Sequence, residues 1–75
     1  MFNKNIFSER LLELRQDNNL TQQQLADIAG ISQPSIVKIE KKHRAASIEV
    51  IYAIAEYFNI SIDWLVGLSD VKERK

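Results

Sequence analysis

The sequence contains no cysteine, one proline and two glycines among its 75 residues. The absence of cysteine excludes disulfide bonds and thiolate metal sites. The longest uninterrupted apolar run, over residues 50–55, is far shorter than the roughly 20 residues that a membrane-spanning helix needs. The first residues show no basic segment followed by an apolar one, so no secretory signal peptide is expected. We therefore expect a cytoplasmic protein with a single small domain.

The sequence also lacks net charge, because ten basic and ten acidic side chains cancel. The two signs are separated along the chain. Residues 38–44 hold four Lys or Arg and one Glu, a net charge of +3, whereas residues 45–70 hold four acids and neither Lys nor Arg, a net charge of −4. Neutral total charge with a local positive segment predicts modest non-specific affinity for nucleic acid. It favours a protein that needs a dimer and a specific DNA site.

Apolar side chains recur at helical spacing along nearly the whole sequence. Phe7, Leu11 and Leu14, spaced i, i+4 and i+7, predict a first helix over roughly residues 5–18. Ser47 and Ser61 are placed to cap a fourth and a fifth helix. The inner face of the fourth helix is expected to hold Ile48, Ile51, Ile54, Ala55 and Phe58. We predict one all-α domain of five helices, with an ordered core over about residues 5–68 and a polar tail over 69–75.

Two short helices in the middle of the chain have clear end signals. Thr21 and Gln24 have the spacing of a capping box, in which each side chain bonds the backbone N–H of the other. Gly30 can end this helix because it adopts a positive φ without strain. Ser32 can cap the next helix, and Pro34 falls in its first turn, where a missing N–H costs nothing.

The spacing across these two helices is constrained further. Two helices that cross near a right angle need a small side chain at the crossing, and Ala26 supplies it. The turn needs one residue with positive φ, which Gly30 supplies, and Ile36 and Ile39 can bury one face of the second helix. Together these positions predict a helix-turn-helix.

The sequence resembles the lambda-repressor-like family of DNA-binding domains, of the Cro/CI/Xre type. The resemblance covers about residues 7–70 and rests on segments 20–26, 30–32, 36, 39–40, 47–49 and 62–67. It implies a compact five-helix bundle in which the second and third helices form the helix-turn-helix. The third helix, over about residues 32–41, would lie in the DNA major groove.

The resemblance also implies which side chains meet DNA. Base edges would be contacted by Ser32, Gln33, Pro34, Ser35, Val37 and Lys38. Phosphates would be contacted by Thr21, Gln22, Lys41, Lys42, His43 and Arg44. The alternative for the glutamines and for the charge run is a solvated surface. A partly buried salt bridge between Arg15 and Glu40 is also implied, joining the first and third helices.

Two residues depart from the family pattern. Lys42 stands where relatives usually have glycine, and Ala46 stands where they usually have proline. Either the third helix runs further, or Lys42 adopts a left-handed conformation at a cost of about 1 kcal/mol. These alternatives leave the path of residues 41–46 open.

The fifth-helix region has more apolar side chains than a short terminal helix needs to pack on the core of its own chain. We expect a two-fold homodimer that binds double-stranded DNA at a palindromic operator. The dimer contact would come from Ile62, Leu65, Val66 and Leu68, and the alternative is that these residues pack inward.

The predicted function is that of a sequence-specific transcriptional regulator, a repressor of prophage or mobile-element type. No enzymatic activity, metal, cofactor or small-molecule substrate is expected, and no membrane association. The alternatives are an antitoxin, a restriction-modification controller, or an interaction module that keeps the fold without binding DNA.

Overall fold

The computed structural model describes residues 4–74. Within this range the helices are α1 (Lys4–Asp17), α2 (Gln22–Ala29), α3 (Gln33–Glu40), α4 (Ile48–Phe58) and α5 (Ile62–Leu65). Strand pairing in the described residues is limited to one isolated antiparallel bridge between Ile60 and Glu73. The predicted all-α class with five helices is confirmed.

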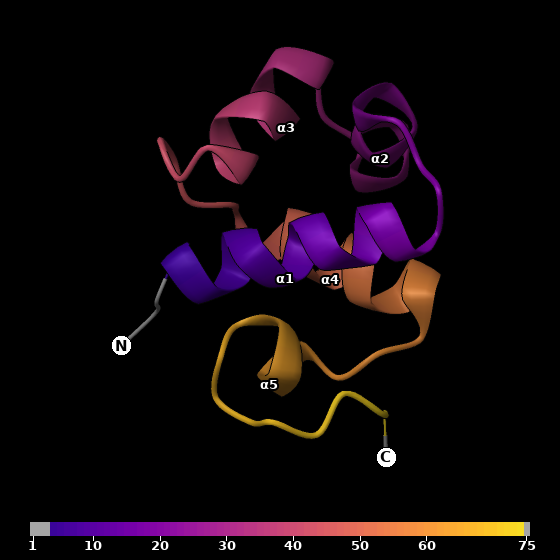
Figure 1. Cartoon of the computed structure of the whole chain (residues 1–75), viewed down its shortest axis with the longest axis vertical. Coiled ribbons are helices and arrows are strands. Elements are labelled where there is room, and N and C mark those ends of the chain that lie inside the picture. Colours follow the sequence, from indigo (N-terminus) through magenta and orange to yellow (C-terminus); the bar gives the residue numbers. More distant parts are fainter. Residues whose placement is uncertain (1–3, 75) are drawn as a thin grey trace.

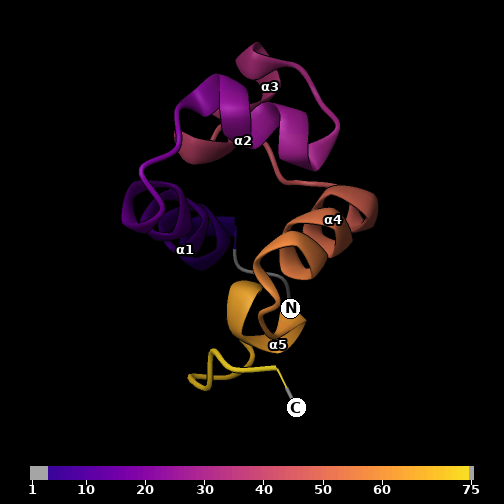
Figure 2. The same cartoon turned by 90° about the vertical axis from the view of Figure 1, so that its right-hand side faces the viewer.

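The helices form three successive layers along the long axis of the molecule (Figure 1). α2 and α3 form one end, α1 and α4 cross the middle, and α5 lies at the other end, an arrangement that is also clear from the side (Figure 2). α2 packs on α3 and α4, and α1 packs on α3 and α5. No helix in the described part of the chain is both long and apolar enough to span a bilayer.

The predicted ends of α2 and the predicted start of α3 are confirmed. The Thr21 hydroxyl accepts from the backbone N–H of Gln24 at 3.1 Å, and the Gln24 side chain accepts from the backbone N–H of Thr21 at 2.8 Å. Gly30 has φ +74° and ends α2 in the left-handed conformation. Ser32 caps α3 by accepting from the backbone N–H of Ser35. Local side-chain chemistry therefore sets the bounds of both helices.

The core is formed by apolar side chains from all five helices. Its largest fully buried members are Phe7, Leu11, Leu14, Leu25, Ile36, Ile39, Ile54 and Leu65. The prediction that Ile48 faces inward is wrong, since this side chain is 69% exposed and Val50 is buried instead. Ile48 lies in the first turn of α4, two positions before the buried Val50.

The fifth-helix residues predicted as a dimer contact separate into two groups. Leu65 is fully buried, so its assignment to a dimer contact is wrong: the side chain fills the core of its own chain. Ile62 and Val66 are partly buried against the same core. Leu68, at 72% exposed, keeps most of its surface available.

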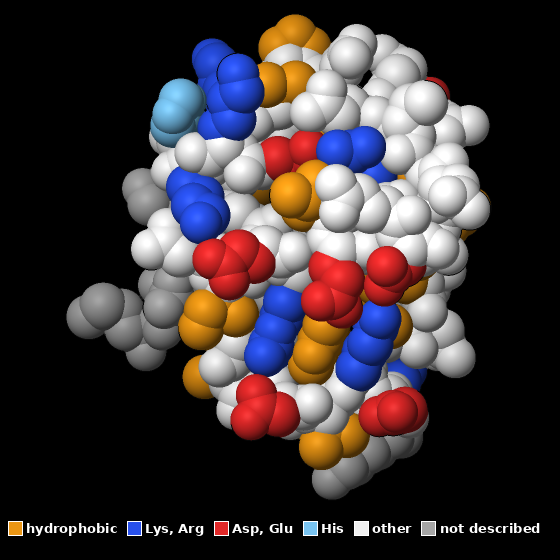
Figure 3. Space-filling view, in the orientation of Figure 1, with side chains coloured by type: hydrophobic (Ala, Val, Ile, Leu, Met, Phe, Trp, Pro, Cys, Tyr) orange, Lys and Arg blue, Asp and Glu red, His pale blue; other side chains and the backbone are white. Residues whose placement is uncertain are grey.

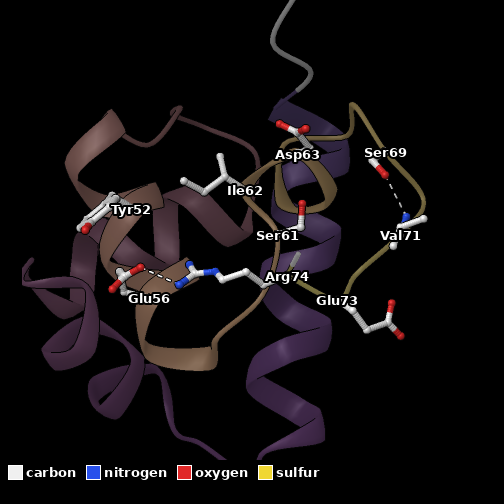
Figure 4. A pocket seen from close by; sticks show the side chains of 9 residues that line it. All are labelled: Tyr52, Glu56, Ser61, Ile62, Asp63, Ser69, Val71, Glu73 and Arg74. Atoms are coloured by element: carbon white, nitrogen blue, oxygen red, sulfur yellow. Dashed lines mark hydrogen bonds and ion pairs between the residues drawn. The ribbon is translucent and has the colours of Figure 1, made fainter.

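The segment over residues 69–74, which we call the strap, folds back beside α5, and its Arg74 side chain reaches Glu56 of α4 (Figure 4). The backbone N–H of Ser61 donates to the Lys72 carbonyl at 2.9 Å. Arg74 donates to the Ile60 carbonyl at 3.2 Å and forms an ion pair with Glu56 at 2.6 Å. The polar composition of this segment did not predict these contacts.

Cations also hold the strap against Trp64, which is buried beneath it. The guanidinium of Arg10 lies 4.9 Å from the centre of the Trp64 ring, and the ammonium of Lys72 lies 5.0 Å from it. Arg10 donates to the carbonyls of Trp64 and Ser69 and pairs with Asp70. Charges and a few backbone bonds, more than apolar packing, therefore attach the strap.

Candidate nucleic-acid interface

α2 and α3 form the predicted helix-turn-helix. Ala26 is fully buried, as the crossing of the two helices requires. Ile36 and Ile39 are fully buried and take up the inner face of α3. The opposite face of α3 is left open to solvent at the end of the molecule farthest from α5 (Figure 1).

Most of the predicted DNA-contacting residues of α3 share this open face with two residues that follow the helix. Together they line a shallow concavity of about 510 Å³, and we call this surface the α3 face. Its members are Gln33, Pro34, Val37, Lys38, Lys41 and His43. Basic and histidine side chains gather over this end of α3 (Figure 3). No side-chain hydrogen bond or ion pair engages Gln33, Lys38, Lys41 or His43 within the described residues.

Two predicted base-contacting residues are engaged inside the chain. The hydroxyls of Ser32 and Ser35 lie 2.9 Å apart, and Ser32 also accepts from the backbone N–H of Ser35. Arg44 donates to the Ser35 hydroxyl at 3.1 Å. The loop after α3 therefore brings the Arg44 guanidinium back to the N-terminal half of the helix.

The remaining predicted phosphate contacts also have internal partners. Gln22 donates to Glu40 at 3.0 Å, and the ammonium of Lys42 lies 3.2 Å from a carboxylate oxygen of Glu9. Thr21 is engaged in the capping box of α2. The structure thus divides the predicted contacts into a group that is free on the α3 face and a group that is held by the chain itself.

The predicted ion pair between Arg15 and Glu40 is present and joins α1 to α3. Arg15 Nε lies 2.7 Å from Glu40 Oε2, and Arg15 Nη2 lies 3.2 Å from Oε1, which is a bidentate geometry. Arg15 Nη1 donates to the Leu20 carbonyl at 3.1 Å. The Glu40 side chain is only 6% exposed and also accepts from Gln22. This network ties α1, α2 and α3 together at the base of the helix-turn-helix.

Of the two alternatives for the path after α3, the structure has the second: the helix does not run further, and Lys42 is left-handed. α3 ends at Glu40, and Lys42 has φ +67° in the left-handed region. The backbone N–H of Lys42 donates to the Ile39 carbonyl at 3.0 Å, and that of His43 donates to the Lys38 carbonyl at 2.8 Å. Lys42 therefore adopts the conformation that glycine usually supplies at this position.

The sequence analysis missed two residues of α1 that contact the end of α3. Ser8 is 1% exposed, and its hydroxyl donates to the Ile39 carbonyl at 2.5 Å. Glu9, the next residue, pairs with Lys42. One signal for Ser8 was available, because it precedes Leu11 by three positions and so lies on the apolar stripe of α1.

Known proteins are similar to this chain in sequence over most of its length. The control protein C.SmaI of Serratia marcescens is 31% identical over 72 residues, which cover 96% of this chain and 86% of C.SmaI. The helix-turn-helix-type transcriptional regulator YobD of Bacillus subtilis is 29% identical over 93% of this chain. The chain spans only 62% of the length of YobD.

A solved structure extends the likeness to three dimensions. The restriction-modification controller protein C.AhdI of Aeromonas hydrophila superposes with a TM-score of 0.71 at 30% identity, covering 80% of this chain and 91% of C.AhdI. The family model described as helix-turn-helix matches residues 11–65, well over half of the chain. The chain therefore belongs to the helix-turn-helix family of the Cro/CI type.

Proposed function

We propose that this protein is a sequence-specific DNA-binding transcriptional regulator that acts in the cytoplasm by occupying DNA. The observation that carries the proposal is the α3 face, where an amide and two ammonium groups without internal partners lie on the outer side of the second helix of a helix-turn-helix. Side chains in this position contact base edges and phosphates in the major groove. Its membership of the family and its similarity to transcriptional regulators support the same function.

Each free side chain of the α3 face has a defined chemical role in this proposal. The Gln33 amide donates one hydrogen bond to adenine N7 and accepts one from the adenine N6 amino group, and Val37 contacts a thymine methyl. Lys38 binds guanine O6 and N7 or a phosphate, and Lys41 binds a phosphate. Arg44, which is placed beside Ser35, extends the phosphate contacts to the N-terminal half of α3.

The proposed regulator binds as a homodimer to a palindromic operator, as a repressor of prophage or mobile-element type. The contact between copies uses the exposed Leu68 and the accessible parts of Ile62 and Val66. A two-fold pair would present one recognition helix to each half of the palindrome. Sedimentation as a monomer at high micromolar concentration would refute the dimer.

A second candidate function is that of a restriction-modification controller. The similarity to C.SmaI and C.AhdI covers nearly the full length of both proteins, whereas YobD is considerably longer than the matched region. A methyltransferase gene beside the gene for this chain would favour the controller. Prophage genes in that place would favour the repressor.

Selection of bound sites from a random pool of DNA duplexes tests the proposal. The selected site is then measured by fluorescence polarisation at several salt concentrations. Gln33→Ala should cost about 1–3 kcal/mol at this site and relax its sequence preference. Lys41→Ala should weaken all sequences alike and lower the salt slope by about 0.9, since one phosphate contact is lost.

The matched control is Glu49→Gln, because this exposed acid lies on α4 and is not among the residues that line the α3 face. It should leave both the sequence preference and the salt slope unchanged. Failure to select any site, or binding that is insensitive to salt, would contradict the proposal and favour an interaction module.

A further inference from the structure

Two adjacent lysines after α3 lie in different surroundings. Lys41 lines the α3 face and has no internal side-chain partner in the described part of the chain. The ammonium of Lys42 lies instead 3.2 Å from Glu9 Oε2 on α1. Their sequence positions suggested the same role for both, so the difference arises from the fold.

The backbone explains why the two side chains diverge. Lys41 still has φ −84°, close to helical geometry, whereas Lys42 has φ +67°. A non-glycine residue in the left-handed region is strained, and such strain persists where surrounding contacts hold the backbone in place. The ion pair with Glu9 is one such contact, and it anchors Lys42 at the side of α1.

α1 holds the same turn through a second, buried contact. The Ser8 hydroxyl donates to the Ile39 carbonyl, which also accepts from the backbone N–H of Lys42. Ser8 and Glu9 are consecutive, so one turn of α1 fixes both the last turn of α3 and the residue that follows it. The orientation of the turn after α3 then determines where Lys41 and His43 lie on the α3 face.

We propose that Lys42 is a positioning residue: Glu9 holds its ammonium on α1, and this pair orients Lys41 and His43 toward DNA while Lys42 makes no phosphate contact. The part of this inference that concerns DNA contacts rests on the proposed function. Its structural part, the coupling of Glu9 to Lys42, stands independently of DNA.

Lys42→Gly and Lys41→Ala form the matched pair of variants that tests this inference. Glycine adopts a positive φ without strain, so Lys42→Gly removes the charge and preserves the turn. Over a salt series on the selected DNA site, Lys41→Ala should lower the salt slope by about 0.9. Lys42→Gly should leave the slope unchanged and reduce affinity by no more than about two-fold, because glycine holds the turn, and with it Lys41, without the ion pair. Lys42→Ala also loses the ion pair but keeps a Cβ in the left-handed region, so it should displace Lys41 and lower both affinity and slope. Equal affinity and slope in Lys42→Ala and Lys42→Gly would overturn the positioning role. A loss of slope in Lys42→Gly equal to that in Lys41→Ala would overturn the proposal.

A double-mutant cycle in urea unfolding, with Glu9→Gln and Lys42→Gly, measures the pair without DNA. Coupling of an exposed ion pair corresponds to a change of about 1.5- to 5-fold in the unfolding equilibrium constant. Full additivity of the two variants would overturn the positioning role. If wild-type protein shows no salt-dependent DNA binding, the proposed function fails, and the cycle still decides whether Glu9 holds Lys42.

Discussion

The ion pair at the base of the helix-turn-helix should be the most sensitive polar contact of the molecule. Arg15→Met leaves the Glu40 carboxylate, 6% exposed, with only the amide of Gln22 as partner. Breaking a buried pair from one side costs about 3–5 kcal/mol, and the residual exposure of Arg15 places this site near 3 kcal/mol. Glu40→Leu should cost less, because the freed guanidinium keeps the Leu20 carbonyl and some contact with water.

The double variant Arg15→Met with Glu40→Leu removes both charges together and leaves no buried charge unpaired. We therefore expect it to be more stable than the Arg15→Met variant alone. Urea unfolding followed by circular dichroism gives the three free energies, and thermal scans give a shift of about 4–8 °C for each kcal/mol. Additive losses in the double variant, or a loss below about 0.5 kcal/mol for Arg15→Met, would refute the reasoning.

Three further variants test other parts of the structure. Gly30→Ala should lower the free energy of unfolding by about 1–2 kcal/mol, because its new Cβ meets no atom within 4 Å and only the left-handed backbone is strained. Leu65→Ala should cost about 2–5 kcal/mol, whereas Leu68→Ala should change the stability of the monomer by less than about 0.5 kcal/mol; equal losses in urea unfolding of dilute, monomeric protein would contradict their placement. Lys72→Gln should loosen the strap and shift the emission of Trp64, the single tryptophan, to longer wavelength. An unchanged emission maximum would show that the strap does not cover the ring.

Sequence predicted the parts of the fold that depend on local chemistry. The capping box of Thr21 and Gln24 and the left-handed Gly30 are decided within a few residues, and both are present. The burial of Ile36 and Ile39 follows from helical spacing alone. The resemblance to a known family added the Arg15 pair with Glu40, which no local rule indicates.

The contacts that were missed join segments far apart in the chain. Glu9 is 33 residues from Lys42, and Arg74 is 18 residues from Glu56. Neither pair has a spacing that a periodic pattern could indicate, because each depends on how α1 or the strap packs in three dimensions. For the α3 face, sequence named the candidate residues, but it did not show which of them the chain itself holds.

The separation of charge described above has a consequence for how the molecule approaches DNA. Its long axis measures 30 Å and runs from the α3 face to α5 (Figure 1). At physiological ionic strength, charges are screened over about 8 Å. A polyanion near Lys38 and Lys41 therefore experiences these cations and not the paired charges at the far end, such as Arg10 with Asp70. The chain is neutral in total but carries cations on the α3 face that are unpaired among the described residues, so the field of DNA should rotate it during approach, with α3 arriving first and the association rate falling as salt is added.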